Sequence, residues 1–136
     1  KEDCLFCKIA KGEIHSATVY EDSHFTVILD VNPATKGHCL IIPKEHFDNI
    51  YDLDGETAGK LFALATCIAR AMKDALKCDG LNLVQNNGEV AGQTVNHFHL
   101  HLIPRYEGDG LNLNWPQQEI SGEQLEEIRQ SIKKSI

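Results

Sequence analysis

The chain has 136 residues, a formal net charge of −7 and 42% hydrophobic residues. This length suits one domain with its own core and is too short for two domains of ordinary size. The basic residues are scattered along the chain, which argues against binding to a nucleic-acid backbone but leaves small anionic ligands possible. No apolar run approaches the roughly 18 residues that a membrane span needs, so we expect no membrane partner.

The five cysteines, at positions 4, 7, 39, 67 and 78, form an odd set. The N-terminal stretch KEDCLFCKIAKGE is charged where a signal peptide needs an apolar segment. An odd count without a secretory signal disfavours a disulfide framework, and we expect a cytoplasmic protein. Cys39 and Cys67 lie in apolar sequence and are predicted to be small buried hydrophobes, whereas Cys4 and Cys7 form a C-x-x-C pair.

The first half of the chain predicts strands that follow one another without a helix between them. After a short N-terminal knuckle, residues 17–21 and 25–30 are rich in β-branched and aromatic residues and are separated by Asp22-Ser23-His24, which predicts a hairpin. A third strand is expected at 37–43. Three strands in quick succession indicate an antiparallel meander rather than a parallel α/β pattern.

A long amphipathic helix is expected at about 55–77, with Asp54 as its N-cap. Its apolar residues recur at three-and-four spacing, at Leu61, Leu64, Ala65, Ile68, Met72, Ala75 and Leu76. These positions are typical of a stripe that faces the core.

The second half of the chain predicts two further strands, at 81–86 and 97–104, joined by a glycine-containing loop. A polar, glycine-rich stretch leads to a last helix that begins at Ser121, whose spacing to Gln124 predicts a capping box. The expected fold class is α+β, in a single domain. It has a five-stranded antiparallel sheet, one long helix and a C-terminal helix.

The segment HFHLHLI at 97–103 places three histidines on one face of the last strand and apolar residues on the other. The histidines could be ordinary surface or core residues, although three in strict alternation are hard to explain in this way. Two of them could bind a metal ion, but the outer pair, about 13 Å apart in a strand, could not easily share one with the third. In a third interpretation the middle imidazole attacks phosphorus, since neutral imidazole is a nucleophile near neutral pH. The preceding loop offers backbone N–H groups around Gly92 and Thr94, and the side chains of Gln93 and Thr94, to phosphate oxygens.

HFHLHLI resembles the alternating signature of the histidine triad (HIT) family of nucleotidyl hydrolases and transferases. Five further segments resemble its Hint-type branch in order and spacing: FCKI (6–9), ILDV (28–31), GHCLIIPKEH (37–46), NNGEVAGQTV (86–95) and NWP (114–116). The match to the family core runs from the N-terminus to residue 116, and residues 117–136 form a C-terminal helical extension outside it. The resemblance implies the HIT-like fold and a homodimer with a continuous sheet across its two subunits.

The resemblance also implies an activity, the hydrolysis of a nucleoside 5′-phosphoramidate or a related adenylyl compound at its α-phosphorus. The family's nucleophile corresponds to His99, which would form a covalent nucleotidyl-histidine intermediate, while His101 would contact the phosphate. Gln93 and Thr94 would position the phosphate and the leaving group. The same comparison extends the site for a purine nucleotide to Phe6, Ile9, Ile28, Asp30, Val31, Asn86 and Gly92. Asp30 suits the ribose hydroxyls because a carboxylate accepts from both, whereas core packing explains the apolar members about as well as a base pocket does.

The Cys4-x-x-Cys7 pair departs from the animal Hint pattern and resembles bacterial members that hold one structural zinc ion per chain. The remaining ligands would be His46 and His97, which closes a tetrahedral Cys₂His₂ set. A redox pair is the alternative, but its thioredoxin-like context is absent. In members without zinc, residues that match His46 and His97 support catalysis instead. The other histidines are expected to be ordinary: His15, His24 and His38.

Three other functions stay open at this point. A dinucleoside polyphosphate hydrolase of the same family would share the chemistry and differ in the leaving group. A nucleotide- or zinc-binding regulatory protein would retain only weak catalysis, and a metallohydrolase would use the H-x-H pair on a catalytic zinc ion. Trp115 and Pro116 match a tail that reaches toward the partner's site in Hint-type dimers, so residues 117–136 are expected to serve dimer packing or substrate selection.

Overall fold

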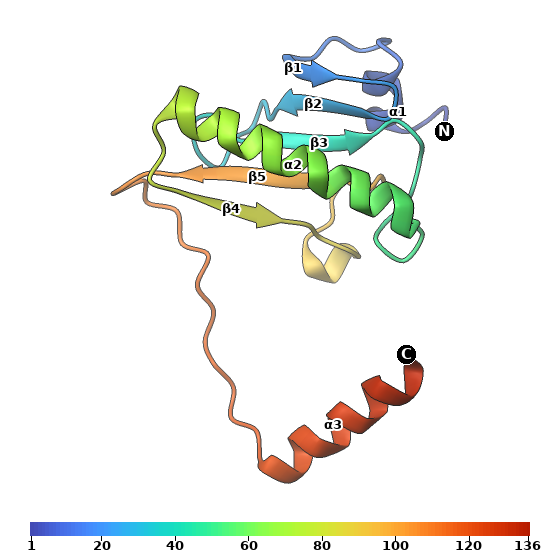
Figure 1. The fold of residues 1–136 in the computed structure, drawn as a ribbon, viewed down its shortest axis with the longest axis vertical. Coiled ribbons are helices and arrows are strands. Elements are labelled where there is room, and N and C mark those ends of the chain that lie inside the picture. The colour runs from blue at the N-terminus through green and yellow to red at the C-terminus, as the bar shows by residue number, and fades with distance from the viewer.

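The computed structural model describes all 136 residues as a five-stranded sheet crossed by one long helix, with a second helix standing apart (Figure 1). In chain order the elements are α1 (Leu5–Ala10), β1 (Thr18–Glu21), β2 (Phe25–Leu29), β3 (Cys39–Pro43), α2 (Gly55–Leu76), β4 (Gly80–Val84), a 3₁₀ helix η1 (Glu89–Ala91), β5 (Leu100–Arg105) and α3 (Gly122–Ser135). All neighbouring strands are antiparallel, in the order β1-β2-β3-β5-β4. The predicted α+β class and sheet are therefore confirmed. None of the helices combines the length and the apolar character that a membrane crossing requires.

One face of the sheet packs against α2 and forms the main core. The buried stripe of α2 consists of Leu61, Ala65, Ile68 and Met72. The predicted N-cap is confirmed, because the Thr57 N–H donates to the Asp54 carboxylate at 3.1 Å. Cys39 is buried as predicted, but the prediction for Cys67 is wrong, since this side chain is exposed. Cys67 lies one residue from Ile68, and that step turns it about 100° away from the buried stripe.

The opposite face of the sheet packs against α1. Phe6 from this helix joins Ile28, Leu40 and Ile42 in a second buried cluster, together with Cys4 and Cys7. The ring of Phe6 meets the His99 imidazole edge to face, with 4.9 Å between the two ring centroids. This short helix therefore brings the N-terminal cysteines to the face of the sheet that carries the histidines.

The strand predicted at 97–104 begins later, at Leu100. The His97 N–H donates to the Val95 carbonyl and the Phe98 N–H to the Phe47 carbonyl, so neither joins the sheet ladder. The side-chain alternation nevertheless persists, because Phe98 and Leu100 belong to the α2 core. The triad histidines consequently share the other face.

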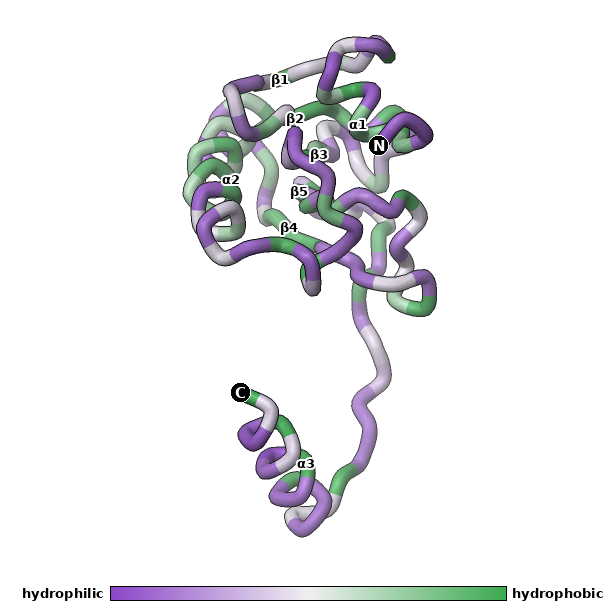
Figure 2. Tube along the Cα trace, turned by 90° about the vertical axis from the view of Figure 1, so that its right-hand side faces the viewer, coloured by the Kyte–Doolittle hydropathy of each residue, from purple (hydrophilic) through white to green (hydrophobic).

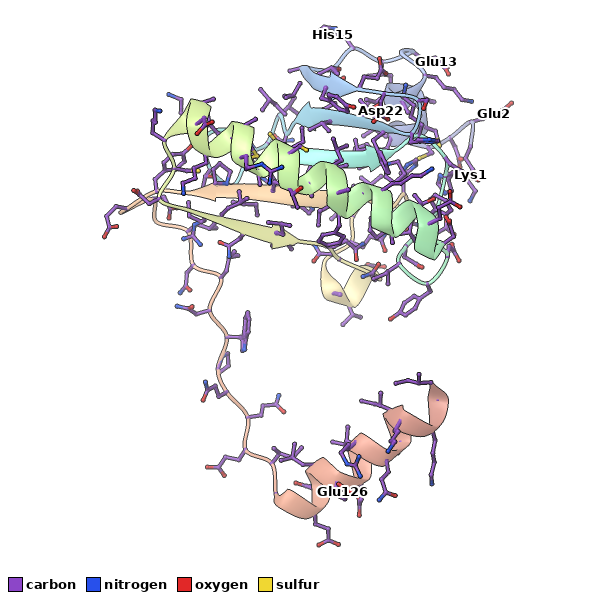
Figure 3. The ribbon with its side chains drawn as sticks, in the orientation of Figure 1. Lys1, Glu2, Glu13, His15, Asp22 and Glu126 are labelled. Atoms are coloured by element: carbon purple, nitrogen blue, oxygen red, sulfur yellow. The ribbon has the colours of Figure 1, made fainter.

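The chain leaves the sheet after β5 and has no helix or strand from residue 106 to the start of α3. The predicted capping box is present, since Gln124 N–H donates to the Ser121 hydroxyl and Ser121 N–H donates to the Gln124 side chain. Every residue of α3 is exposed, and apolar and polar positions alternate along it (Figure 2). The helix, on which Glu126 lies, stands apart from the sheet, with open space between the two (Figure 3). We call residues 112–136 the C-terminal arm.

Candidate active site and metal cluster

A cavity of about 490 Å³ lies on the α1 side of the sheet. Eight of the eleven residues predicted to bind a nucleotide line it: Phe6, Ile9, Ile28, Asp30, Val31, Thr94, His99 and His101. His15, read as ordinary from the sequence, also lines it from the loop between α1 and β1 (Figure 3). The cavity thus combines an apolar wall with a carboxylate, two hydroxyls and three imidazoles, as a site for a small polar ligand requires.

A backbone carbonyl determines which ring nitrogen of His99 carries the proton. Its Nδ1 lies 2.7 Å from the His97 carbonyl oxygen. A carbonyl can only accept, so Nδ1 carries the proton and Nε2 keeps its lone pair. The side chain is 7% exposed, and it lines the cavity. His99 therefore combines a largely buried ring with an unprotonated Nε2 at the cavity wall.

A chain of hydrogen bonds gives His101 the opposite tautomer. The Ala34 backbone N–H donates to His38 Nδ1 at 3.0 Å, which leaves the His38 proton on Nε2. His38 Nε2 then donates to His101 Nδ1 at 2.9 Å, so the proton of neutral His101 lies on its Nε2. The Asp30 carboxylate is 3.8 Å from His38 Nε2. His99 and His101 therefore offer an acceptor and a donor side by side, with ring centroids 4.9 Å apart.

Burial keeps these imidazoles neutral. Desolvation, followed by the neighbouring imidazoles of His99 and His38, lowers the pKa of His101 to about 4. Desolvation also lowers the pKa of His99, against the opposing hydrogen bond to the His97 carbonyl. Burial likewise lowers the pKa of His38, although Asp30 acts in the other direction. All three are neutral at neutral pH, which the assigned tautomers require.

The side chain of Gln93 stabilises the loop that precedes the triad histidines. The Gln93 side-chain amide donates to the Asp48 and Val95 carbonyls at 2.6 and 3.0 Å, and its oxygen accepts from the Gly88 N–H at 2.8 Å. Three residues predicted to bind the nucleotide, Asn86, Gly92 and Gln93, do not line the cavity.

Gly92 and Asn86 lie against each other in the same loop. Gly92 has φ of +100° and its carbonyl accepts from the Asn86 amide at 3.5 Å. A Cβ at position 92 would stand 3.4 Å from the Asn86 side-chain nitrogen. Both residues shape the loop that carries Thr94 to the cavity.

The four predicted metal ligands converge beside the cavity. The sulfur and ring-nitrogen atoms of Cys4, Cys7, His46 and His97 all lie within 4.8 Å of one another. His97 Nδ1 is 3.3 Å from Cys4 Sγ and 3.5 Å from Cys7 Sγ, and His46 Nδ1 is 3.3 Å from Cys7 Sγ. Around a tetrahedral zinc ion, ordinary Zn–S and Zn–N bonds place sulfur and nitrogen about 3.6 Å apart. The four residues can therefore hold a metal ion of this kind.

The hydrogen-bond partners of the two histidine ligands also support a metal site. His97 Nε2 donates to the Pro43 carbonyl at 2.8 Å, and His46 Nε2 donates to the Asp48 carboxylate at 2.7 Å. Both rings consequently turn an unprotonated Nδ1 toward the two sulfur atoms. Metal-binding histidines almost always donate their second nitrogen in this way.

Comparisons with known proteins identify the family of the chain. The HIT domain family matches residues 11–108. "Protein hit" of Bacillus subtilis is 46% identical to this chain, over 99% of the chain and 95% of that protein. Adenosine 5′-monophosphoramidase HNT1 of Saccharomyces cerevisiae is 40% identical, over 95% and 80%. Adenylylsulfatase HINT3 of Arabidopsis thaliana is also 40% identical, over 82% of this chain and 56% of that protein.

Solved structures of related proteins have the same fold as this chain. A HIT family protein of Bacillus anthracis superimposes with a TM-score of 0.94 at 45% identity, over 99% of this chain and 98% of that one. A Streptococcus mutans protein gives 0.95 at 46% identity, over 99% and 86%. A zinc-bound histidine triad family protein of Mycobacterium smegmatis gives 0.78 at 39% identity, over 99% of both chains. The chain therefore belongs to the HIT family.

Proposed function

We propose that this protein hydrolyses a nucleoside 5′-phosphoramidate, or a related adenylyl compound, at the α-phosphorus through a covalent intermediate on His99. The observation that carries the proposal is the His99 tautomer, whose Nε2 lone pair is kept free because Nδ1 donates to the His97 carbonyl. The phosphoramidase and adenylylsulfatase among the relatives support the substrate class.

In the first step, Nε2 of His99 attacks phosphorus and a P–N bond forms as the bond to the leaving amine breaks. The amine takes a proton from solvent. The imidazole ring becomes positively charged, and its Nδ1–H strengthens its hydrogen bond to the His97 carbonyl. The Nε2–H of His101 donates to a phosphate oxygen, which bears more charge in the transition state.

In the second step, water attacks the same phosphorus and the bond to His99 Nε2 breaks. The nucleoside monophosphate leaves, the water proton passes to solvent, and the neutral imidazole is restored. Thr94 lies at the cavity wall to contact phosphate. Gln93 acts through the loop that its three hydrogen bonds hold, as a positioning residue.

The nucleoside would lie along the remaining walls of the cavity. Asp30, which follows β2 and is partly exposed, lines the cavity and would accept from the ribose hydroxyls. The base would stack between the apolar side chains of Phe6, Ile9, Ile28 and Val31. Asn86 and Gly92 contribute by shaping the loop opposite.

We further propose that Cys4, Cys7, His46 and His97 hold one structural zinc ion. All four positions of a tetrahedral site are filled by protein atoms, which leaves none for water or substrate. The ion would fix α1, and with it Phe6, against the triad segment. Free thiolate ligands need a reducing compartment, which supports a cytoplasmic location.

We also propose a homodimer, as the Hint-type resemblance implies. β4 supports it, because this edge strand pairs only with β5 and carries no proline or lysine to discourage pairing.

The test of the activity is to incubate the protein with adenosine 5′-phosphoramidate labelled in the phosphate, quench it in alkali and look for label on the protein. We expect an acid-labile adduct in wild type, none in His99→Asn, and a loss of turnover of at least about a thousandfold in that variant. His24→Asn, an exposed histidine outside the cavity, serves as the matched control and should retain both.

Turnover by wild type without an adduct, combined with full activity of His99→Asn, would refute the nucleophile. Parallel assays with a diadenosine polyphosphate and with adenylyl sulfate then compare leaving groups, since the attack at phosphorus is shared.

A further inference from the structure

Residues 31–37, in the connection between β2 and β3, carry the group that sets the His38 tautomer. The Ala34 N–H donates to His38 Nδ1 at 3.0 Å. Ala34 itself is exposed, and Thr35, at 8% exposure, is the one buried residue of this segment. Loop backbone at the surface is ordinarily more mobile than the strands that it connects. A hydrogen bond that selects a tautomer therefore needs this segment to be anchored to the body of the protein.

Two hydroxyl groups anchor the segment to the end of β5. The Thr35 hydroxyl donates to the Pro104 carbonyl at 2.5 Å, and the Tyr106 hydroxyl donates to the Lys36 carbonyl at 2.6 Å. These contacts are possible because the start of β3 and the end of β5 lie at the same end of the sheet (Figure 1). The two hydrogen bonds thus hold both residues that follow Ala34.

The pairing of β3 with β5 stops before it reaches this segment. Its last pair is Cys39 with Leu102, so Pro104 lies two residues beyond it. Gly37, with φ of +96°, turns the chain away from the strand direction at this point. A buried carbonyl without a donor is costly, and Pro104 is buried. The Thr35 hydroxyl therefore supplies from a side chain the contact that a longer β3 would supply from its backbone.

We propose that Thr35 and Tyr106 are positioning residues of the reaction. They hold the Ala34 N–H in place, and this group fixes the tautomer of His38. His38 in turn donates to His101, the imidazole assigned to the phosphate. Neither Thr35 nor Tyr106 lines the cavity, so both act through the histidines. The inference rests on the proposed function, because the tautomer of His101 affects turnover only if its Nε2–H donates to the substrate.

Nitrogen NMR of the full chain, with zinc present and its histidines labelled with nitrogen-15, tests the proposal without a substrate. In wild type, His38 and His101 should each show a protonated Nε2 and an unprotonated Nδ1. Thr35→Val keeps the shape of the side chain and removes the hydroxyl. We expect it to populate both tautomers, so that the two nitrogen shifts of each ring move toward each other. Thr35→Ser keeps the hydroxyl and should retain the wild-type shifts.

Kinetics with the phosphoramidate supply the second readout. We expect Thr35→Val to lower kcat about tenfold with little change in KM, and Tyr106→Phe to lower it about twofold to fivefold. In His38→Ala the tautomer is already free, so adding Thr35→Val to this variant should cause no further loss. Thr66→Val is the matched control, because it removes an exposed hydroxyl that donates to the Ala63 carbonyl at 2.8 Å.

Two results would overturn the positioning role. One is an unchanged pair of nitrogen shifts for His38 and His101 in Thr35→Val. The other is a loss of kcat from Thr35→Val that is equally large with and without His38, as a general loss of structure would produce. If Thr35→Val does not fold, Tyr106→Phe decides the question by the same NMR measurement, because the Tyr106 hydroxyl is exposed. A wild type without phosphoramidase activity would overturn the proposed function, and the nitrogen shifts would still test the two hydroxyls.

Discussion

At the residue scale, the site depends on which ring nitrogen of each histidine holds the proton. A backbone carbonyl fixes His99, and a backbone N–H fixes His101 through His38. The two neighbouring imidazoles are thereby given opposite roles. Neither assignment needs a charged imidazole, so both hold throughout the neutral pH range in which the buried rings stay unprotonated.

Replacing His38 should therefore damage catalysis without removing any group that contacts substrate. In His38→Ala, His101 Nδ1 loses its donor and the ring is free to adopt the other tautomer, so we expect kcat to fall about tenfold to a hundredfold with little change in KM. His38→Gln keeps an amide donor and an acceptor and should recover most of the loss. Steady-state kinetics of the two variants make the comparison. Equal activity of His38→Ala and wild type would show that the tautomer is not set by this chain.

Sequence alone could not single out His38. Its partner His101 lies 63 positions away, and their meeting depends on the pairing of β3 with β5. The role of Asp48 behind His46 was also missed, although the two residues are only two positions apart. His99 and His101, by contrast, could be predicted because the alternation that exposes them is local.

At the scale of elements, α1 depends on the metal cluster for its position. Asp48 accepts from His46 Nε2, and this hydrogen bond, the largest influence on the carboxyl, lowers the pKa of Asp48. Asp48→Ala removes the acceptor, so we expect zinc affinity to fall about tenfold to a hundredfold.

Competition with a coloured zinc chelator measures that change, and Asp74→Ala, an exposed carboxylate on α2, is the control. Elemental analysis of wild type should give about one zinc ion per chain. A protein purified under reducing conditions without bound metal would contradict the assignment.

The turn into β3 gives a second prediction at this scale. Gly37 has φ of +96°, and a Cβ there would lie 2.6 Å from Leu76 Cδ1 at the end of α2. Gly37→Ala should lower the free energy of unfolding by about 1–3 kcal/mol. Gly59→Ala is the matched control, because Gly59 lies inside α2 with open space around it and should raise stability by up to about 1 kcal/mol. Urea denaturation reports both, and the same sign for the two variants would contradict the argument.

Local signals of this kind explain how much of the elements could be predicted. The cap at Asp54 and the capping box at Ser121 each involve residues within one helical turn, and both are present. The start of β5 was placed three residues early because the backbone partners of His97 and Phe98 lie outside the sheet. Apolar spacing in α3 predicted a helix but could not predict that all of its residues are exposed.

At the scale of the whole molecule, burying neutral histidines links stability to pH. The pKa of His101 is about 4 in the folded protein and 6.5 for an ordinary histidine. Between these values the unfolded chain binds a proton that the folded chain does not, so the free energy of unfolding falls as the pH drops from about 6.5 to about 4. Below that range both states are protonated and this group causes no further loss. Allowing for the partial exposure of the ring, we expect a decrease of about 2 kcal/mol.

Urea denaturation between pH 7.5 and pH 4 measures this decrease in the free energy of unfolding. His101→Gln should make the dependence smaller and leave the part that the other buried histidines contribute, whereas His24→Gln, which removes an exposed histidine, should leave it intact. Equal stability of wild type at pH 7.5 and pH 4.5 would mean that His101 is protonated in the folded state, and the donor assigned to its Nε2 would then no longer depend on His38.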